Sequence, residues 1–308
     1  MSWLALPSPA RLRAWTPGVA GALLLLACVL PAIDLPRDTV DILVVFDITQ
    51  SMDVQDVELD GARTSRLAYA RESARRALRV LPCGSRVGWA AFTEYRTLVL
   101  LAPIEVCDNY GDLLATLARI DGRMRWGNAS EISKGVFWAM RAAKELDAKP
   151  ALVFVTDGHE SPPLAQSGAP LFDDLAPGQI HGWLAGVGGP VPVPIPRSDA
   201  AGRAFGYWRA QDVVQLSPSA GRPPSHEQLS QLHDGHLRAL AAQVGFDYAT
   251  LDDVSTLAGL MHDPRLARRI RVPADVAWLP ATAALLLLAW HFRPAPWPRR
   301  PVSRISGT

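Results

Sequence analysis

The chain has 308 residues, of which 49% are hydrophobic and 20% are charged, so it can build a core and is not disordered by composition. Lysine and arginine number 31 and aspartate and glutamate number 30, a balance that gives no reason to expect a nucleic acid partner. Three cysteines exclude a zinc ribbon and a disulfide-rich scaffold.

Two uncharged stretches near the ends of the chain predict transmembrane helices. The first, residues 14–33, is long enough to cross the hydrocarbon core of a bilayer as a helix. A cleaved signal peptide is the alternative for this stretch, although residues 31–33 make a poor cleavage site. The second, residues 276–292, is shorter, and Trp278 and Trp290 lie near its edges as interfacial aromatic residues do.

The charges that flank these stretches predict the orientation. Arginines precede the first stretch and follow the second, so the positive-inside rule places the tails, residues 1–13 and 293–308, in the cytoplasm and the domain between them outside. Four arginines just before the second stretch argue the other way, unless they belong to the last helix of a folded domain: Arg265, Arg268, Arg269 and Arg271. Cys83 and Cys107 either pair in an oxidising compartment or remain two separate thiols.

Between the stretches, residues 38–271 predict one α/β domain. Buried strands and amphipathic helices alternate along this region, which predicts a doubly wound, mostly parallel sheet with helices on both faces. A segment rich in proline and glycine, residues 190–225, is expected to be a surface insertion. The expected strands are 41–47, 87–92, 97–101, 151–156, 179–187 and 246–250, and the expected helices are 65–81, 110–120, 131–146, 229–244 and 254–270.

Oxygen-bearing side chains are expected where two of these strands end. Asp47 and Asp157 follow buried strands, Thr49 and Ser51 come just after Asp47, and Ser130 begins a predicted helix. Ligands of open α/β sheets bind outside the carboxyl ends of the strands. A set of two carboxylates and three hydroxyls suits a hard divalent cation such as Mg²⁺. Taken singly, each hydroxyl could instead cap a helix or turn.

The pattern resembles the von Willebrand factor A (VWA) family. Residues 47–51, Asp-Ile-Thr-Gln-Ser, are similar to the Asp-x-Ser-x-Ser of that family's metal-ion-dependent adhesion site, and Asp56 completes a Ser-Met-x-x-x-Asp seen in many bacterial members. Residues 155–158 resemble the family's second strand motif. Residues 130–136 resemble the stretch that holds its distant threonine, so Ser130 takes that position, with Asn128 as the alternative.

The resemblance covers residues 40–261 and implies a binding protein rather than an enzyme. It implies that Asp47, Thr49, Ser51, Ser130 and Asp157 hold Mg²⁺, or another hard cation such as Ca²⁺ or Mn²⁺. An acidic side chain of a partner protein would complete the shell of ligands.

A narrower resemblance concerns bacterial membrane-anchored VWA proteins that are encoded with MoxR-type AAA+ ATPases. It is carried by residues 82–88, 92–96, 106–107, 156–160 and 188–196. It implies a two-pass protein of the bacterial inner membrane whose domain faces the periplasm. Its implied partners are a MoxR-type ATPase system and other VWA proteins. The implied task is assembly or metal insertion for a partner such as periplasmic methanol dehydrogenase.

Two other functions remain open. Asp47 could be the nucleophile of a Mg²⁺-dependent phosphohydrolase, although that chemistry needs a second carboxylate where Thr49 stands. The domain could also be a membrane scaffold without a metal. His159 and Glu160 are candidates for the rim of the site, and the pair of histidines at 233 and 236 is either part of a zinc site or a solvated helix face.

Overall fold

The computed structural model describes residues 9–163, 175–199, 201–215 and 226–293, with the backbone alone for residues 9–14. The chain forms two compact units. One is Arg37–Ile270, and the other combines Met1–Pro36 with Arg271–Thr308.

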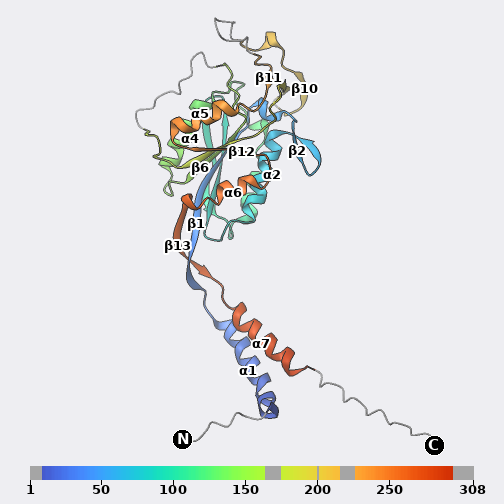
Figure 1. Cartoon of the computed structure of the whole chain (residues 1–308), viewed down its shortest axis with the longest axis vertical. Coiled ribbons are helices and arrows are strands. Elements are labelled where there is room, and N and C mark those ends of the chain that lie inside the picture. The colour runs from blue at the N-terminus through green and yellow to red at the C-terminus, as the bar shows by residue number, and fades with distance from the viewer. Residues whose placement is uncertain (1–8, 164–174, 200, 216–225, 294–308) are drawn as a thin grey trace, which may run out of the picture. The chain divides into compact units, whose positions relative to one another are not determined.

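A mostly parallel sheet forms the centre of the Arg37–Ile270 unit, as the alternation of strands and helices predicts (Figure 1). Its strands follow the order β12-β7-β6-β1-β4-β5, and β13 also pairs with β1. The pairs β12–β7, β7–β6, β6–β1 and β1–β4 are parallel, whereas β4 and β5 form an antiparallel hairpin. The strands are β1 (Ile33–Asp47), β4 (Arg86–Thr93), β5 (Arg96–Glu105), β6 (Ala151–Thr156), β7 (Gly182–Gly186), β12 (Asp247–Thr250) and β13 (Ala267–Ala274).

Helices cover both faces of this sheet. On β1, Ile42, Val44 and Phe46 belong to the hydrophobic cluster that packs against α2, α3 and α6, and Leu43 and Val45 belong to the cluster that packs against α4 and α5. A strand buried on both faces has no polar side, which explains the continuous apolar run in the sequence. The helices are α2 (Arg66–Leu78), α3 (Tyr110–Leu117), α4 (Ile132–Glu145), α5 (Asp234–Val244) and α6 (Thr256–Met261).

Short elements surround the carboxyl ends of the strands. The loop after β1 forms η1 (Gln50–Asp53) and the hairpin β2–β3 (Val57–Leu59 and Ala62–Thr64), and η2 (Gly122–Met124) precedes α4. In its described residues, the proline-rich insertion pairs outside the main sheet, as expected: β8 pairs with β11, which follows the insertion, and β9 pairs with β10. These are β8 (Val193–Pro194), β9 (Pro196–Ser198), β10 (Ala204–Tyr207) and β11 (Leu229–Ser230), with η3 at Ala210–Asp212.

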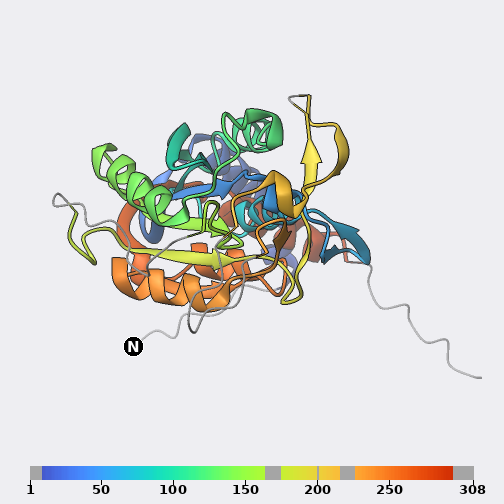
Figure 2. The ribbon, with the colours of Figure 1, turned by 90° about the horizontal axis from the view of Figure 1, so that it is seen from above.

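Figure 2 looks down on this end of the sheet, and the yellow hairpin β9–β10 stands out from the rest of the unit. Residues 200 and 216–225 of the insertion lie outside the described part of the chain.

The prediction of a last helix over residues 254–270 is wrong beyond Met261. The side chain of Asp263 accepts a hydrogen bond from Arg265 N, and Pro264 begins the short helix η4 (Pro264–Leu266) instead of continuing α6. Arg268, Arg269 and Arg271 then lie on strand β13, which pairs with β1. The helix expected over 229–244 likewise begins only at Asp234, because Leu229 and Ser230 pair with β8.

The second unit contains two helices, α1 (Pro9–Val29) and α7 (Trp278–His291), which lie side by side (Figure 1). Thr16 Oγ1 and His291 Nδ1 form a hydrogen bond of 2.6 Å between them. The helices overlap the two expected spans, residues 14–33 and 276–292. Within the described part of the chain, no helix has both the length and the apolar character needed to cross a membrane. Most of the two expected tails, residues 1–8 and 294–308, lies outside the described residues.

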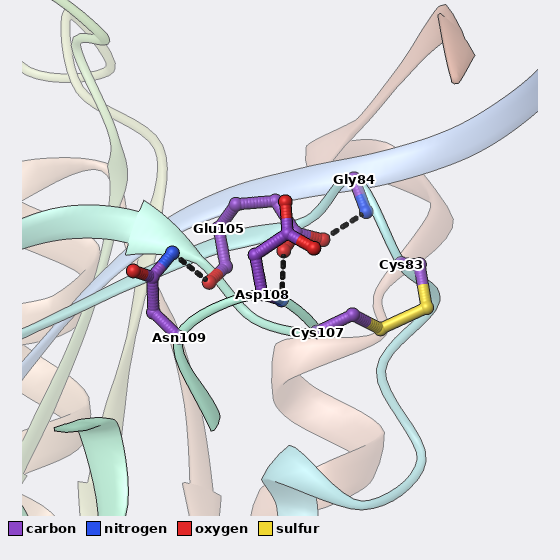
Figure 3. Close-up of a disulfide and its surroundings, with 6 residues drawn as sticks. All are labelled: Cys83, Gly84, Glu105, Cys107, Asp108 and Asn109. Atoms are coloured by element: carbon purple, nitrogen blue, oxygen red, sulfur yellow. Dashed lines mark hydrogen bonds between the residues drawn. A yellow bond between two sulfur atoms is a disulfide. The ribbon is translucent and has the colours of Figure 1, made fainter. Parts of the chain in front are cut away.

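Cys83 and Cys107 form a disulfide, one of the two arrangements that the sequence left open (Figure 3). It joins the segment before β4 to the segment after β5. The carboxylate of Glu105 accepts hydrogen bonds of 2.6 Å from both Gly84 N and Asp108 N, on either side of the disulfide. The backbone around the bridge is therefore fixed by polar contacts as well as by the covalent bond.

Candidate functional site

Two buried aspartates lie at the carboxyl ends of neighbouring parallel strands. Asp47 ends β1, and Asp157 directly follows β6. In the register of these two strands, Phe46, one residue before Asp47, pairs with Val155, two residues before Asp157. Neither aspartate side chain is exposed. Asp47 Oδ1 accepts hydrogen bonds from Thr49 N and Thr49 Oγ1 at 2.8 and 2.7 Å, and Oδ2 accepts one from Thr156 Oγ1 at 2.7 Å.

Three buried residues that carry hydroxyls line a cavity of about 260 Å³ at this edge: Thr49, Ser51 and Ser130. Thr49 Oγ1 and Ser51 Oγ are 3.1 Å apart. Two backbone hydrogen bonds join Ser130 and Ser161: Ser130 N donates to Ser161 O at 2.6 Å, and Ser161 N donates to Ser130 O at 2.7 Å. The Oγ of Ser130 is buried and has no hydrogen-bond partner among the described residues. A buried hydroxyl without a partner is costly, so this atom needs a further partner to be satisfied.

A fully buried arginine, Arg66, neutralises Asp157. Its Nη1 donates to Asp157 Oδ2 at 2.5 Å and to Ser230 Oγ at 2.6 Å. Its Nε and Nη2 donate to the two carboxylate oxygens of Asp56 at 2.9 and 2.6 Å. Ser230 Oγ also donates to Asp157 Oδ2, and His159 N donates to Asp157 Oδ1. Both oxygens of Asp157 are therefore engaged by the protein.

The two aspartates differ in charge state because their surroundings differ. Burial, followed by the negative charge of Asp157, raises the pKa of Asp47 to about 7, against the hydrogen bonds from Thr49 and Thr156. Burial also acts to raise the pKa of Asp157, but the charge of Arg66 and further contacts outweigh it and hold that pKa below its ordinary value. At neutral pH, the pair thus combines a fixed carboxylate with one that is close to its titration point.

The other sequence candidates have different surroundings. Asn128 Oδ1 accepts from Gln50 Nε2 at 3.0 Å, whereas Ser130 Oγ has no partner among the described residues. Asp56 accepts hydrogen bonds from Arg66 and from Gly189 N and is not among the residues that line the cavity. Glu160 caps α4 by accepting from the backbone N–H groups of Ile132 and Ser133, and is not among the residues that line the cavity.

His159 does line the cavity and is 4% exposed. Burial lowers its pKa to about 4, so the imidazole is neutral at pH 7. Neither ring nitrogen has a hydrogen-bond partner among the described residues, and Glu227 Oε2 lies 3.7 Å from Nε2. Its ring packs against that of His233 with a centroid distance of 5.6 Å.

The histidines of α5 and its start do not assemble a zinc site. His236 Nε2 contacts Glu160 Oε1 at 3.1 Å, and the described residues contain no group of three or more His, Cys, Asp or Glu that could hold a metal ion. A cation at the sheet edge would instead depend on the hydroxyl oxygens of Thr49, Ser51 and Ser130.

The insertion forms one wall of the cavity. Ile195, Trp208 and Val213 from this segment line it together with Thr49, Ser51 and Ser130. Trp208 Nε1 donates to Gln50 Oε1 at 2.6 Å, which ties the insertion to the loop after β1. The composition predicts a surface insertion, and the structure shows in addition that this segment forms part of the cavity wall.

Arg66, Ser230 and Trp208 are absent from the sequence-based candidate set. A signal for Arg66 existed, because it lies four residues before Ala70 on the apolar face of α2, where an arginine needs buried carboxylate partners. Trp208 lies in the insertion, which has no periodic pattern, and Ser230 lies on β11 in a segment expected to be helical, so the sequence carries no comparable signal for either.

Comparison with known proteins addresses the family and the fold. Residues 42–159 match the family model described as the von Willebrand factor type A domain. The VWA match runs from β1 to the residue two positions after Asp157 and includes Asp47, Thr49, Ser51 and Ser130. A comparison with curated proteins finds no match.

Comparison with solved structures addresses the fold. A conserved hypothetical protein, BatB from Bacteroides thetaiotaomicron, is 18% identical with a TM-score of 0.50, and the alignment covers 73% of this chain and 98% of that one. An aerotolerance-related membrane protein from Bacteroides fragilis is also 18% identical, with the same coverage and a TM-score of 0.48. The first of these similarities shows a shared α/β fold of the VWA type.

Proposed function

We propose that the VWA-type domain binds a hard divalent cation, such as Mg²⁺, and uses it to hold a carboxylate of a partner protein. The hydroxyls of Thr49, Ser51 and Ser130 are the direct ligands. Asp47 and Asp157 act through water, since the protein already engages both oxygens of each. When bound, the cation supplies an electrophilic centre to which an anionic group can be attached.

The observation that carries this proposal is the state of Ser130. Ser130 lines the same cavity as Thr49 and Ser51, and its buried Oγ has no hydrogen-bond partner among the described residues. If a hydroxyl only capped α4 or a turn, its oxygen would accept a backbone N–H, and Glu160 already performs that task for α4. A hard cation accounts for the oxygen that capping leaves unexplained.

The protein groups at the site would neutralise only part of the cation's charge, which favours the binding of an anion from outside. Three of the five proposed ligands are neutral hydroxyls, and Arg66 compensates Asp157. A cation held in this way keeps net positive character, which suits a carboxylate from outside.

A phosphohydrolase that uses Asp47 as the nucleophile is less well supported. Both of its carboxylate oxygens accept hydrogen bonds from Thr49 and Thr156, and Thr49 stands where that chemistry needs a second acid. The described geometry offers no free nucleophilic oxygen on this residue.

The paired helices α1 and α7 are proposed to attach the chain to a membrane. Large apolar side chains on both remain exposed, among them Leu25, Val29, Leu285 and Leu286 at 63 to 76%. The disulfide Cys83–Cys107 fits an oxidising compartment such as the periplasm. The two-pass inner-membrane topology, the MoxR-type ATPase and methanol dehydrogenase as partners stay predictions.

The experiment that tests the proposal is a calorimetric titration of the purified full chain with Mg²⁺, followed by partner capture from solubilised membranes in Mg²⁺ or EDTA. We expect one Mg²⁺ site, lost in Ser51→Ala and kept in Ser73→Ala, a matched control whose buried Oγ donates to Tyr69 O within α2. Capture should require Mg²⁺ and fail with Asp47→Ala. Capture that persists in EDTA would contradict the metal claim.

A further inference from the structure

The main sheet ends in an edge strand. Strand β5 is the last in the sheet order, and among the described residues it pairs only with β4. An edge strand presents a row of backbone N–H and C=O groups that can pair with another chain, and proteins usually block such an edge with proline, lysine or a bulge. Pro103 lies in the second half of β5, where the pairing with β4 is irregular between Val99 and Ile104. Residues 96–99 pair regularly with β4 and contain no proline, lysine or bulge, so this stretch carries none of these blocking devices.

A groove of about 360 Å³ lies beside this stretch of β5. Its lining residues come from β5, from the loop before α4 and from α4 itself: Arg96, Thr97, Leu98, Trp126 and Trp138. Leu98 and Trp126 are 54% and 46% exposed, so their apolar side chains present surface to the solvent. Thr97 Oγ1 donates to Gly135 O at 2.9 Å, which fixes α4 against β5 one turn before Trp138. An exposed apolar groove beside an open strand edge is typical of a surface that binds another chain.

The groove carries a single charge, that of Arg96. This exposed guanidinium stacks on the rings of Trp138 and Tyr95, with distances of 4.9 and 5.4 Å to the ring centroids, and forms no ion pair among the described residues. No acidic residue lines the groove, and residues 97–104 contain none. A segment that complements the groove therefore carries a carboxylate next to a large apolar side chain. The same stretch of a second copy would bring another arginine and no acid, so charge favours a different partner.

From these observations we propose that β5 binds an extended, acidic segment of a partner protein as an additional strand of the sheet. The backbone of the segment pairs with residues 96–99. Alternate side chains of a strand point to the same side, so one apolar side chain enters the groove between Leu98 and Trp126 while a carboxylate two residues away pairs with Arg96. No residue lines both this groove and the cavity at the proposed cation site, so this interaction needs no metal.

The test measures fluorescence polarisation of a labelled peptide amide, Thr-Val-Phe-Val-Asp-Thr, with the purified full chain in detergent. Its phenylalanine and aspartate project from the same side of an extended backbone. We expect saturable binding that is equal in Mg²⁺ and in EDTA, and slower amide hydrogen exchange in residues 96–99 when the peptide is bound. Two further peptides carry N-methyl groups on alternate residues, one set on each edge. The set that faces β5 should abolish binding, because it removes the backbone donors, and the other set should not.

Three variants of exposed residues test the contacts of the groove. Trp126→Ala should weaken peptide binding by about thirtyfold, the effect of removing an aromatic anchor. Leu98→Lys places a charge on the edge and should abolish binding, whereas Val80→Lys, a matched control at a residue that is 61% exposed and does not line the groove, should leave it unchanged. Arg96→Glu should weaken binding by about tenfold, because an attractive pair becomes a repulsive one. A peptide with lysine in place of aspartate should bind Arg96→Glu more tightly than it binds the wild type.

Several outcomes would overturn the inference. The first is the absence of peptide binding, and the second is binding that both N-methylated peptides retain equally. Binding that EDTA abolishes would place the peptide at the cation site instead. Self-association of the chain that Leu98→Lys abolishes would identify a second copy as the occupant of the edge. A peptide that copies residues 164–174 and competes at equal concentration would assign the groove to this chain's own segment. The proposed cation site is unaffected by a negative result, since its Mg²⁺ titration is measured without the peptide.

Discussion

Replacing Ser130 with alanine should change stability in opposite directions with and without the cation. In EDTA, the variant loses a buried hydroxyl that has no partner among the described residues, so it should be more stable than the wild type by about 1 kcal/mol. With Mg²⁺ at a hundredfold excess over its dissociation constant, binding stabilises the wild type by about 2.7 kcal/mol. If the variant binds tenfold more weakly, the same concentration stabilises it by only about 1.4 kcal/mol.

The assay is urea unfolding of the full chain in detergent, with Mg²⁺ or EDTA, for wild type, Ser130→Ala and Ser73→Ala. Ser73 Oγ is equally buried but donates to Tyr69 O at 2.9 Å, so its removal should cost about 1 kcal/mol in both conditions. The reasoning is refuted if Ser130→Ala is destabilised in EDTA, or if Mg²⁺ stabilises it as much as the wild type.

Three further predictions concern Arg66, the disulfide Cys83–Cys107 and the titration of Asp47. Arg66→Met leaves two buried carboxylates without their cation and should cost about 3–5 kcal/mol in urea unfolding. Arg75→Met on the same helix removes only a partly exposed pair and should cost less than about 1 kcal/mol; equal costs would contradict the network. Replacing both Cys83 and Cys107 with serine opens a loop of sequence separation 24 and should cost about 3 kcal/mol, a loss that reductant should reproduce in the wild type. The pKa of Asp47 is raised from 3.8 to about 7, so between these pH values the cation-free fold binds more protons than the unfolded chain. This group's contribution to stability is therefore complete below pH 3.8, declines as the pH rises from there and is lost above about pH 7. Because a cation needs the carboxylate, Mg²⁺ affinity should instead rise with pH, by up to about tenfold per unit below 7, and calorimetry that finds no such rise would count against the site.

The fold could be predicted because burial on both faces leaves a visible trace in the sequence. Residues 41–47 carry no polar side chain between two aspartates, and β1 packs against a helix layer on each side. The same logic located the strand ends, and with them Asp47 and Asp157. The helix expected over residues 254–270 is wrong beyond Met261 because Pro264 begins η4 instead of continuing α6, and the residues from Ala267 onward pair with β1 as β13.

The rest of the site depends on contacts between distant parts of the chain. Arg66 binds Asp157, which is 91 residues away in the sequence. The periodicity of α2 identifies the buried face of the helix but does not show which residues would pair with a buried charge there. Trp208 reaches Gln50 across 158 positions from a proline-rich segment whose strands are two to four residues long. Such segments have no hydrophobic period, so their place over the cavity follows only from tertiary structure.

The most direct test of the central claim is a crystal structure of the chain grown with Mn²⁺, with anomalous scattering used to locate the ion. The account predicts one anomalous peak at the carboxyl ends of β1 and β6, within about 2.2 Å of the hydroxyl oxygens of Thr49, Ser51 and Ser130, close to the distance that Mg²⁺ prefers. A peak elsewhere, or none at this edge, would contradict it.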